Sequence, residues 1–170
     1  MKKNIFFALL FCFSIATFSQ SEITAYKDGE WLQYKMSYSG FLTAGTASLE
    51  LKEETLEDKE VFHAIGKGWT TGMIKWFFKV DDLYQSYFDK ASLKPYVFKR
   101  KIDEGGYKKN RNTYFNYQND TALVQDYIQQ KETRVAFKNV QDMMSSFYYL
   151  RNQDVSKMQI GDVIKIDMFL

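Results

Sequence analysis

Two runs of alternating apolar and polar residues flank a segment with two glycines, and this pattern constrains the fold more than any other feature. Gly40 and Gly45 lie between the two runs, and the stretch from Gly40 to the end of the second run spans residues 40–51. Alternation with period two is typical of a strand with one buried face, and glycine permits a positive φ, a bulge or a close backbone approach. The pattern predicts a long, bent antiparallel hairpin to whose edge later strands add. The apolar positions of its two strands are Leu32, Tyr34, Met36, Tyr38, Ala47, Leu49 and Leu51.

Further strand patterns follow along the chain, separated by charged or glycine-containing turns. In the third run, Phe62, Ala64, Gly66 and Gly68 share one face, and this stripe of small residues allows another element to lie close to the sheet. The sequence therefore predicts a mainly β fold, a single curved antiparallel sheet, open or forming a partial barrel, with two short covering helices. The expected later strands are 60–69, 81–88, 96–102, 108–117, 121–128, 133–137 and a last one carrying Ile164, Ile166, Met168 and Leu170.

Two segments change from the strand period to helical spacing. Residues 70–78 predict a short helix of about two turns, with Thr70 or Thr71 as its N-cap. Residues 139–152 give the clearer helical pattern. Asn139 is its expected N-cap, and Asp142 is the expected N3 residue of a capping-box-like pair. The apolar positions of the two helices are Met73, Ile74, Phe77 and Phe78, then Val140, Met143, Met144, Phe147 and Leu150.

Residues 1–19 have the features of a cleaved secretory signal peptide. Lys2 and Lys3 precede an apolar stretch, and small residues near Ser19 offer a cleavage site. The stretch is too short for a transmembrane helix and lacks a stop-transfer flank. A buried N-terminal helix and an uncleaved anchor are the alternatives. We therefore expect the protein to be periplasmic, or otherwise exported through a cleaved signal peptide.

The composition argues against several classes of function. Removal of Lys2 and Lys3 takes the formal charge from +2 to zero, so the mature domain lacks the basic surface that nucleic-acid binding needs. No later stretch approaches the roughly 18 consecutive apolar residues of a membrane-spanning helix, so no transmembrane span is expected after signal cleavage. The only cysteine, Cys12, lies within the signal and follows the bulky Phe11, which does not suit a lipoprotein acceptor site. The mature β domain, residues 20–170, is expected to lack disulfides, thiol chemistry and cofactors.

Polar residues suited to catalysis or metal binding are few and scattered. His63 is the only histidine, and its place in an alternating strand favours a half-buried structural residue over a general base. One histidine without a mature cysteine also argues against a transition-metal site. Asp81 and Asp82 are adjacent, so on a strand they point to opposite faces and cannot form a carboxylate pair together. With Asp89 and Asp103, they are expected to serve turns and strand ends.

A basic cluster and a high aromatic content are the remaining signals of binding. The cluster covers residues 99–101 and 108–111, and it is interpreted as a solvated hairpin or as a surface for anionic lipid headgroups or glycans. Aromatic residues make up 18% of the chain. They either fill the core of the sheet or line a pocket for an apolar ligand, and both interpretations stay open. The residues expected to line such a pocket are Trp69, Met73, Trp76, Phe77, Met143, Met144 and Phe147.

Three groups of residues resemble those of a known family. They are Tyr34-x-Met36-x-Tyr38-x-Gly40-x-x-x-Ala44-Gly45, then Val80-Asp81-Asp82 with Tyr87-Phe88-Asp89, Pro95 and Phe98-x-Arg100, and finally Asp142 to Arg151 with Phe147-Tyr148-Tyr149-Leu150-Arg151. In this order and spacing they resemble domain-of-unknown-function family 3108, exported proteins of Gram-negative bacteria. The resemblance covers about residues 30–170.

The resemblance implies a large curved antiparallel sheet, partly barrel-like and similar to periplasmic lipoprotein carriers, and it implies no particular activity. Members of the family usually continue for several more strands. The last expected strand ends this chain in mid-pattern, on an apolar edge of the kind that invites aggregation. We therefore expect the chain to be a C-terminally truncated member.

These observations lead to three hypotheses about function. In the first, a non-enzymatic periplasmic β domain binds an apolar or lipid-like ligand, or an outer-membrane protein, by reversible burial of apolar surface gated by the helix at residues 70–78. In the second, a structural or assembly protein uses exposed sheet edges to accept strands from a partner. The third, a hydrolase, would need two carboxylates facing one cleft, with a raised pKa. The first is favoured, so the sequence predicts a protein that is not an enzyme.

Overall fold

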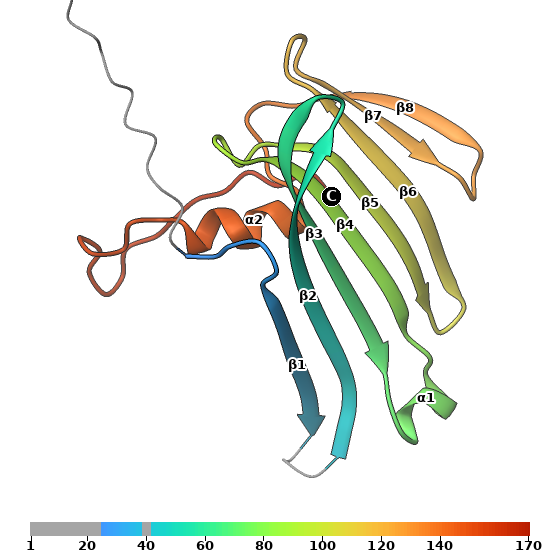
Figure 1. The fold of residues 1–170 in the computed structure, drawn as a ribbon. Coiled ribbons are helices and arrows are strands. Elements are labelled where there is room, and N and C mark those ends of the chain that lie inside the picture. The colour runs from blue at the N-terminus through green and yellow to red at the C-terminus, as the bar shows by residue number, and fades with distance from the viewer. Residues whose placement is uncertain (1–24, 39–41) are drawn as a thin grey trace, which may run out of the picture.

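Eight strands follow one another across a single antiparallel sheet in the order β1 to β8 (Figure 1). The computed structural model describes residues 25–38 and 42–170. The predicted signal peptide and Gly40 lie outside the described residues. The sheet is open, with β1 and β8 at its two edges, so the mainly β prediction is confirmed. The strands are β1 Trp31–Tyr38, β2 Leu42–Leu56, β3 Lys59–Thr70, β4 Asp81–Asp89, β5 Pro95–Glu104, β6 Tyr107–Asn116, β7 Thr121–Asp126 and β8 Lys131–Ala136.

The opening hairpin is long and bent, as its glycine pattern predicts. The β1–β2 register shifts between Met36 and Ser37, opposite Gly45. A side chain at Gly45 would come within 3.0 Å of the Trp69 carbonyl oxygen on β3, so glycine allows the strands to approach closely there. The prediction that β1 has a buried apolar face is wrong, because Tyr34 and Met36 are exposed. Among the described residues, no second layer covers that edge of the sheet.

One face of the sheet carries the hydrophobic core. Helix α2, Met143–Arg151, packs on this face against β3 and β4. Its Met144 lies directly over Gly66, where an added Cβ would come within 2.9 Å of the methionine Cε. The predicted stripe of small residues on β3 therefore does admit a close-packed element. The large buried apolar side chains of this core include Tyr26, Leu51, Phe62, Phe88, Phe98, Phe115, Phe137 and Tyr148.

Helix α2 begins three residues later than predicted at its N-cap. Asp142 is the N-cap itself rather than the N3 residue, and Ser145 completes a capping box with it. The expected cap, Asn139, has a left-handed φ of 48° and lies in the turn before the helix. The buried side of α2 is centred on Met144 and Tyr148, whereas Met143 and Leu150 of the predicted stripe are exposed. The buried stripe differs from the predicted one because the position of the N-cap determines which residues of the helix face the sheet.

Helix α1, Ile74–Phe77, is a single turn rather than the two turns predicted. Thr70 belongs to β3, and its hydroxyl accepts a hydrogen bond from the Val80 backbone N–H at 2.9 Å. Neither it nor Thr71 caps the helix, which has Met73 at the N-cap without a side-chain hydrogen bond. The β3–β4 connection therefore has only the four helical residues of α1, with turn and irregular backbone on both sides.

The predicted last strand does not form a ladder. The segment after Gly161 makes one isolated parallel bridge between Met168 and Gln141. Its backbone bonds run from the Gln141 N–H to the Asp167 oxygen and from the Phe169 N–H to the Gln141 oxygen, each at 2.9 Å. Phe169 then packs edge-on against Phe115. The alternating sequence yields only one bridge because the short turn before α2 is its only hydrogen-bonding partner among the described residues.

Candidate functional site

An exposed apolar surface lies at the end of the sheet where α1 connects β3 to β4 (Figure 1). We call Met73, Trp76, Phe77 and Phe78 the apolar tip. Trp76 and Phe77 are 85% and 84% exposed, and Met73 and Phe78 are exposed as well. Consecutive helical residues are about 100° apart, so large side chains at neighbouring positions cannot share one buried side. The single turn of α1 buries none of its residues and presents them away from the sheet.

The apolar tip is fixed to the neighbouring β5–β6 turn. The Phe78 ring lies against Gly105, whose φ of +54° and missing side chain leave room for the ring. The Gly105 N–H donates to the Lys79 carbonyl oxygen at 2.8 Å. The Lys79 ammonium group donates to Asp103 at 3.1 Å. These contacts position an apolar surface that the sheet itself does not cover.

The seven residues predicted to line one apolar pocket are divided between two places. Trp69, Met73, Trp76 and Phe77 lie at or next to the end of the sheet that carries α1. The other three, Met143, Met144 and Phe147, belong to α2, on the core face of β3 and β4. Of these, Met144 is a core residue with 4% exposure. The two helices therefore do not form a common pocket.

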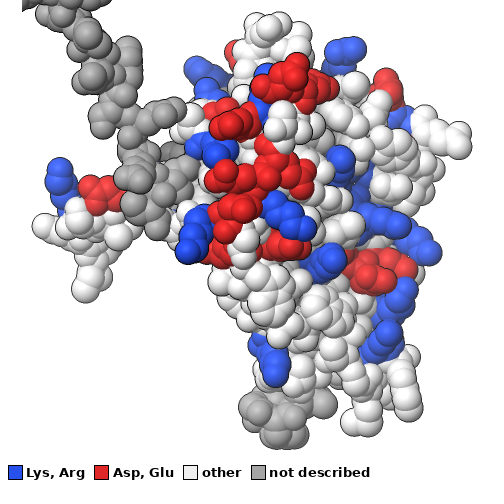
Figure 2. Space-filling model, in the orientation of Figure 1, with Lys and Arg blue, Asp and Glu red and all other residues white. Residues whose placement is uncertain are grey.

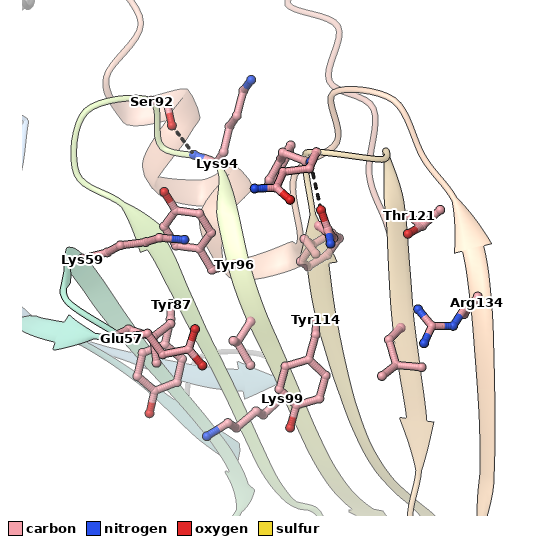
Figure 3. A pocket seen from close by; sticks show the side chains of 17 residues that line it. Glu57, Lys59, Tyr87, Ser92, Lys94, Tyr96, Lys99, Tyr114, Thr121 and Arg134 are labelled. Carbon is pink, nitrogen blue, oxygen red and sulfur yellow. Dashed lines mark hydrogen bonds between the residues drawn. The ribbon is translucent and has the colours of Figure 1, made fainter.

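A groove of about 830 Å³ occupies the sheet face opposite α2, near the β2–β3 turn (Figure 3). We call it the tyrosine groove, because four tyrosines line it together with three lysines and an arginine. The sequence does not reveal it, since its residues come from β2 to β8 and are brought together only by the strand register. Tyr87, Val97, Tyr114, Leu123 and Arg134 are successive cross-strand neighbours. The tyrosines are Tyr87, Tyr96, Tyr114 and Tyr117, and the cations are Lys59, Lys94, Lys99 and Arg134.

Lysine side chains lie across the tyrosine rings of the groove. The Lys59 ammonium is 4.4 Å from the centre of the Tyr96 ring, as Figure 3 illustrates. Lys99 stands 4.9 Å from the centre of the Tyr87 ring, and Lys94 makes a similar contact with Tyr117 at 5.3 Å. Among the residues that the structure describes, Glu57 is the only acidic one lining the groove. The groove therefore presents cations held at defined positions on aromatic surfaces.

Three phenol groups of the groove, those of Tyr87, Tyr96 and Tyr117, remain neutral hydrogen-bonding groups at physiological pH. Burial raises the pKa of Tyr87, Tyr96 and Tyr117 above the ordinary tyrosine value. The Tyr96 hydroxyl donates to Asp89 at 3.1 Å, and the Tyr117 hydroxyl donates to the Pro95 carbonyl oxygen at 3.0 Å. Both bonds fix the rings before any ligand arrives.

His63 supports the groove from within the sheet. Its ring stacks on Tyr87 with the centroids 4.0 Å apart and the planes at 13°. Its nitrogens lie 2.8 Å from the Glu54 carboxylate and 3.0 Å from the Gln85 side-chain oxygen. The ring is buried, as a structural strand residue should be, and it has hydrogen-bond partners on both sides. We assign it the role of holding Tyr87 in place.

The acidic residues that were considered for catalysis lie in surroundings that suit structural roles. Asp81 is exposed and Asp82 is buried, on opposite faces of β4 as predicted. Burial and a shared hydrogen bond with Glu104 raise the pKa of Asp82 to about 6. Asp82 and Glu104 line neither the tyrosine groove nor the 460 Å³ cavity beside the β5–β6 hairpin, whereas Asp81 and Asp103 both line that cavity. Asp89 accepts bonds from the 91–92 turn, as expected of turn chemistry. Within the described part of the chain, no three His, Cys, Asp or Glu side chains are grouped to hold a metal ion.

The predicted basic cluster is divided between the two faces of the sheet and along the length of β5 and β6. Lys101, Lys108 and Lys109 line the 460 Å³ cavity near the apolar tip. Lys99 instead contributes to the tyrosine groove. Arg111 forms an ion pair with Asp126 at 2.6 Å. Only the first group forms a basic border to the tip.

The architecture defines a class of protein: an open single-sheet β domain with a helix packed on one face and an aromatic, basic groove on the other. Among residues 25–38 and 42–170, no helix has the length and apolarity required to cross a membrane. The chain belongs to the family described as Protein of unknown function (DUF3108), whose model matches residues 33–170. The resemblance found in the sequence is thus confirmed. No curated protein and no solved structure matches the chain.

Proposed function

We propose that this protein is an exported, non-enzymatic binding domain that attaches to an anionic lipid surface through its apolar tip. The observation that carries the proposal is the near-complete exposure of Trp76 and Phe77 in a one-turn helix that is fixed to the rest of the domain. Burying a large apolar side chain is worth about 1.5–3 kcal/mol. Two adjacent aromatic side chains in water therefore lack several kcal/mol of burial free energy, which contact with an apolar surface would supply.

The charges around the tip favour a lipid interface over another apolar partner. Lys75 and Lys79 are exposed beside the aromatic side chains, and Lys101 and Lys108 on the β5–β6 hairpin continue this border, in which Asp103 pairs with Lys79 and Lys108. Aromatic side chains accompanied by lysine are the usual composition of segments that lie in the membrane interface. Each lysine near an anionic surface adds about 1 kcal/mol of attraction.

The opposite end of the sheet carries the opposite charge. Acidic side chains gather over the β2–β3 hairpin, whereas the lower end of the same face has few charges (Figure 2). The acids of this hairpin include Glu53, Glu54, Glu57, Asp58 and Glu60. β2 has 15 residues, which at about 3.3 Å each separates its ends by roughly 45–50 Å. An anionic membrane would thus attract the tip and repel the far end, which orients the domain.

Removal of the tip aromatics is expected to abolish this attachment. In a sedimentation assay with vesicles of neutral and anionic phospholipid, Trp76→Ala/Phe77→Ala should bind at least about tenfold more weakly than the wild type. The thermal stability should change little, because both side chains are exposed. Trp31→Ala is the matched control, since Trp31 is an exposed tryptophan on the edge strand β1.

Two outcomes would contradict the lipid proposal. One is a wild-type protein that does not sediment with anionic vesicles, and the other is a double variant that sediments as well as the wild type. A loss of binding in Trp31→Ala alone would instead favour the alternative, in which the exposed edge strand with Trp31, Tyr34 and Met36 meets an assembly partner.

The mass of the exported protein tests whether a signal peptide is cleaved. The positive n-region and apolar stretch of residues 1–19 lead us to expect cleavage near Ser19. Intact-mass spectrometry of the periplasmic fraction should give a chain that lacks residues 1–18 and begins at residue 20 or 21. A full-length mass in that fraction would exclude cleavage.

A further inference from the structure

We propose that the tyrosine groove binds an acidic saccharide, a ligand in which sugar rings carry carboxylate, phosphate or sulfate groups. This site is separate from the apolar tip, since the groove borders the β2–β3 turn and α1 lies at the other end of the same strands (Figures 1 and 3). The inference does not depend on membrane attachment.

The backbone around the groove favours recognition by side chains. Strands β3 to β7 are hydrogen-bonded to neighbours on both sides, so an extended peptide could pair only with the edge strand β8, which contributes Arg134 alone to the groove. What it offers instead is a row of rings and hydroxyl groups across the sheet. Flat aromatic rings pack against the C–H faces of sugars, and phenol groups exchange hydrogen bonds with sugar hydroxyls. Tyr114 on β6 is an exposed ring of this kind, beside Lys99 (Figure 3).

The charge of the groove selects an anionic ligand. Lys59, Lys94, Lys99 and Arg134 line it against the single carboxylate of Glu57. The other acids of the β2–β3 hairpin do not line the groove. A guanidinium group such as that of Arg134 can hold a carboxylate or phosphate through two parallel hydrogen bonds. A ligand that combines rings with acidic groups therefore satisfies both kinds of side chain in the groove.

The groove is also preorganised. His63 stacks beneath Tyr87, and hydrogen bonds fix Tyr96 and Tyr117. Side chains that are already ordered lose less entropy when a ligand binds. The volume of about 830 Å³ lies within the range of about 300–1,000 Å³ that is typical of small-molecule sites. A short oligosaccharide fits that volume.

Titration calorimetry of the full mature chain with tetragalacturonic acid tests the proposal. The acidic tetrasaccharide should bind, and neutral maltotetraose of similar size should bind at least about tenfold more weakly. Arg134→Ala and Lys99→Ala should each reduce affinity by about tenfold through loss of a charge-assisted contact. Tyr114→Ala should weaken binding, whereas Tyr114→Phe, which keeps the ring, should retain most of it.

A matched control comes from the same strand as Arg134. Lys131 is an exposed cation on β8 that pairs in register with Asp126, on the other face of the sheet. Lys131→Ala should leave the affinity unchanged. All of these positions are at the surface or partly exposed, and a thermal melt identifies any variant that does not fold.

Three results would overturn the proposal. Tetragalacturonic acid that produces no heat at millimolar concentration would exclude an acidic saccharide of this type. A tetraglutamate peptide or a short single-stranded DNA that binds as tightly would indicate a general polyanion surface. Equal losses in Lys131→Ala and Arg134→Ala would place binding outside the groove. None of these results depends on the vesicle assay of the apolar tip, so the two proposals fail separately.

Discussion

Replacing Met144 by aspartate is expected to lower the free energy of unfolding by about 3–5 kcal/mol, because it buries an unpaired charge. Met144 is 4% exposed and lies over Gly66 on β3. The methionine side chain already fills the space above this glycine, where an added Cβ would come within 2.9 Å of it. The aspartate would therefore be forced into the core, or the helix would have to leave the sheet. Urea denaturation followed by circular dichroism gives the change in free energy.

Met143→Asp is the matched control for this substitution. Met143 precedes Met144 in sequence but is 36% exposed, and it is the first residue of α2. An aspartate in the first turn interacts favourably with the helix dipole, so this variant should lose less than about 1 kcal/mol. Similar losses in the two variants would show that neither methionine is specifically seated on the sheet.

The strands could be predicted from the sequence because alternation and turn residues are local signals. The predicted runs at 60–69 and 81–88 correspond closely to β3 and β4. The ends of the helices were harder to predict from the sequence. Asp142 and Asn139 are both acceptable caps by residue type, and the choice between them depends on Ser86, a β4 residue that donates to Asp142. That contact spans more than fifty positions of sequence, so no local pattern contains it.

The two candidate sites differ in how far the sequence reveals them. The apolar tip is a local feature, because Trp76, Phe77 and Phe78 are consecutive and cannot all be covered by one sheet. The tyrosine groove is not local, because Tyr87 on β4 and Arg134 on β8 can be placed in one row only when the register of every strand between them is known. Its tyrosines look like ordinary sheet residues in the sequence. The predicted pocket failed to assemble for the same reason, since spacing alone does not place two helices relative to each other.

Among the buried polar residues of the core, Asp142 is the one whose replacement is expected to lower the stability most. Its carboxylate accepts hydrogen bonds from the Met144 N–H at 2.8 Å, the Ser145 N–H at 2.9 Å and the Ser86 hydroxyl at 2.6 Å. Asp142→Ala should cost about 2–4 kcal/mol, since it removes an N-cap and leaves a buried hydroxyl without a partner. Asp142→Asn keeps an acceptor at the N-cap and should cost much less. Urea denaturation at pH 5 distinguishes the two variants, and equal losses would contradict the capping role.

The same carboxyl group should make stability fall as the pH rises. Burial outweighs the hydrogen bonds and raises the pKa of Asp142 from 3.8 to about 6. The folded protein therefore holds this proton more tightly than the unfolded chain, so the stabilisation is complete below about pH 4 and is lost as the pH rises through 6, by up to roughly 3 kcal/mol. Asp82 has a similarly raised pKa and contributes in the same window. The comparison must therefore be between the wild type and Asp142→Asn, in which the contribution of Asp82 cancels.

The asparagine cannot ionise, so its free energy of unfolding should decline less than that of the wild type between pH 4 and pH 7. The difference between the two proteins should change by up to roughly 3 kcal/mol across this interval, in favour of the variant at the higher pH. Arg100 on β5 is the nearby cation, and because it stays charged throughout the interval it adds no step of its own. If the two stability curves are parallel, the hydrogen-bond donors around Asp142 keep its carboxyl group ionised at both pH values. The carboxylate would then be an N-cap whose burial is fully offset by its hydrogen bonds, rather than a buried charge that opposes folding at neutral pH.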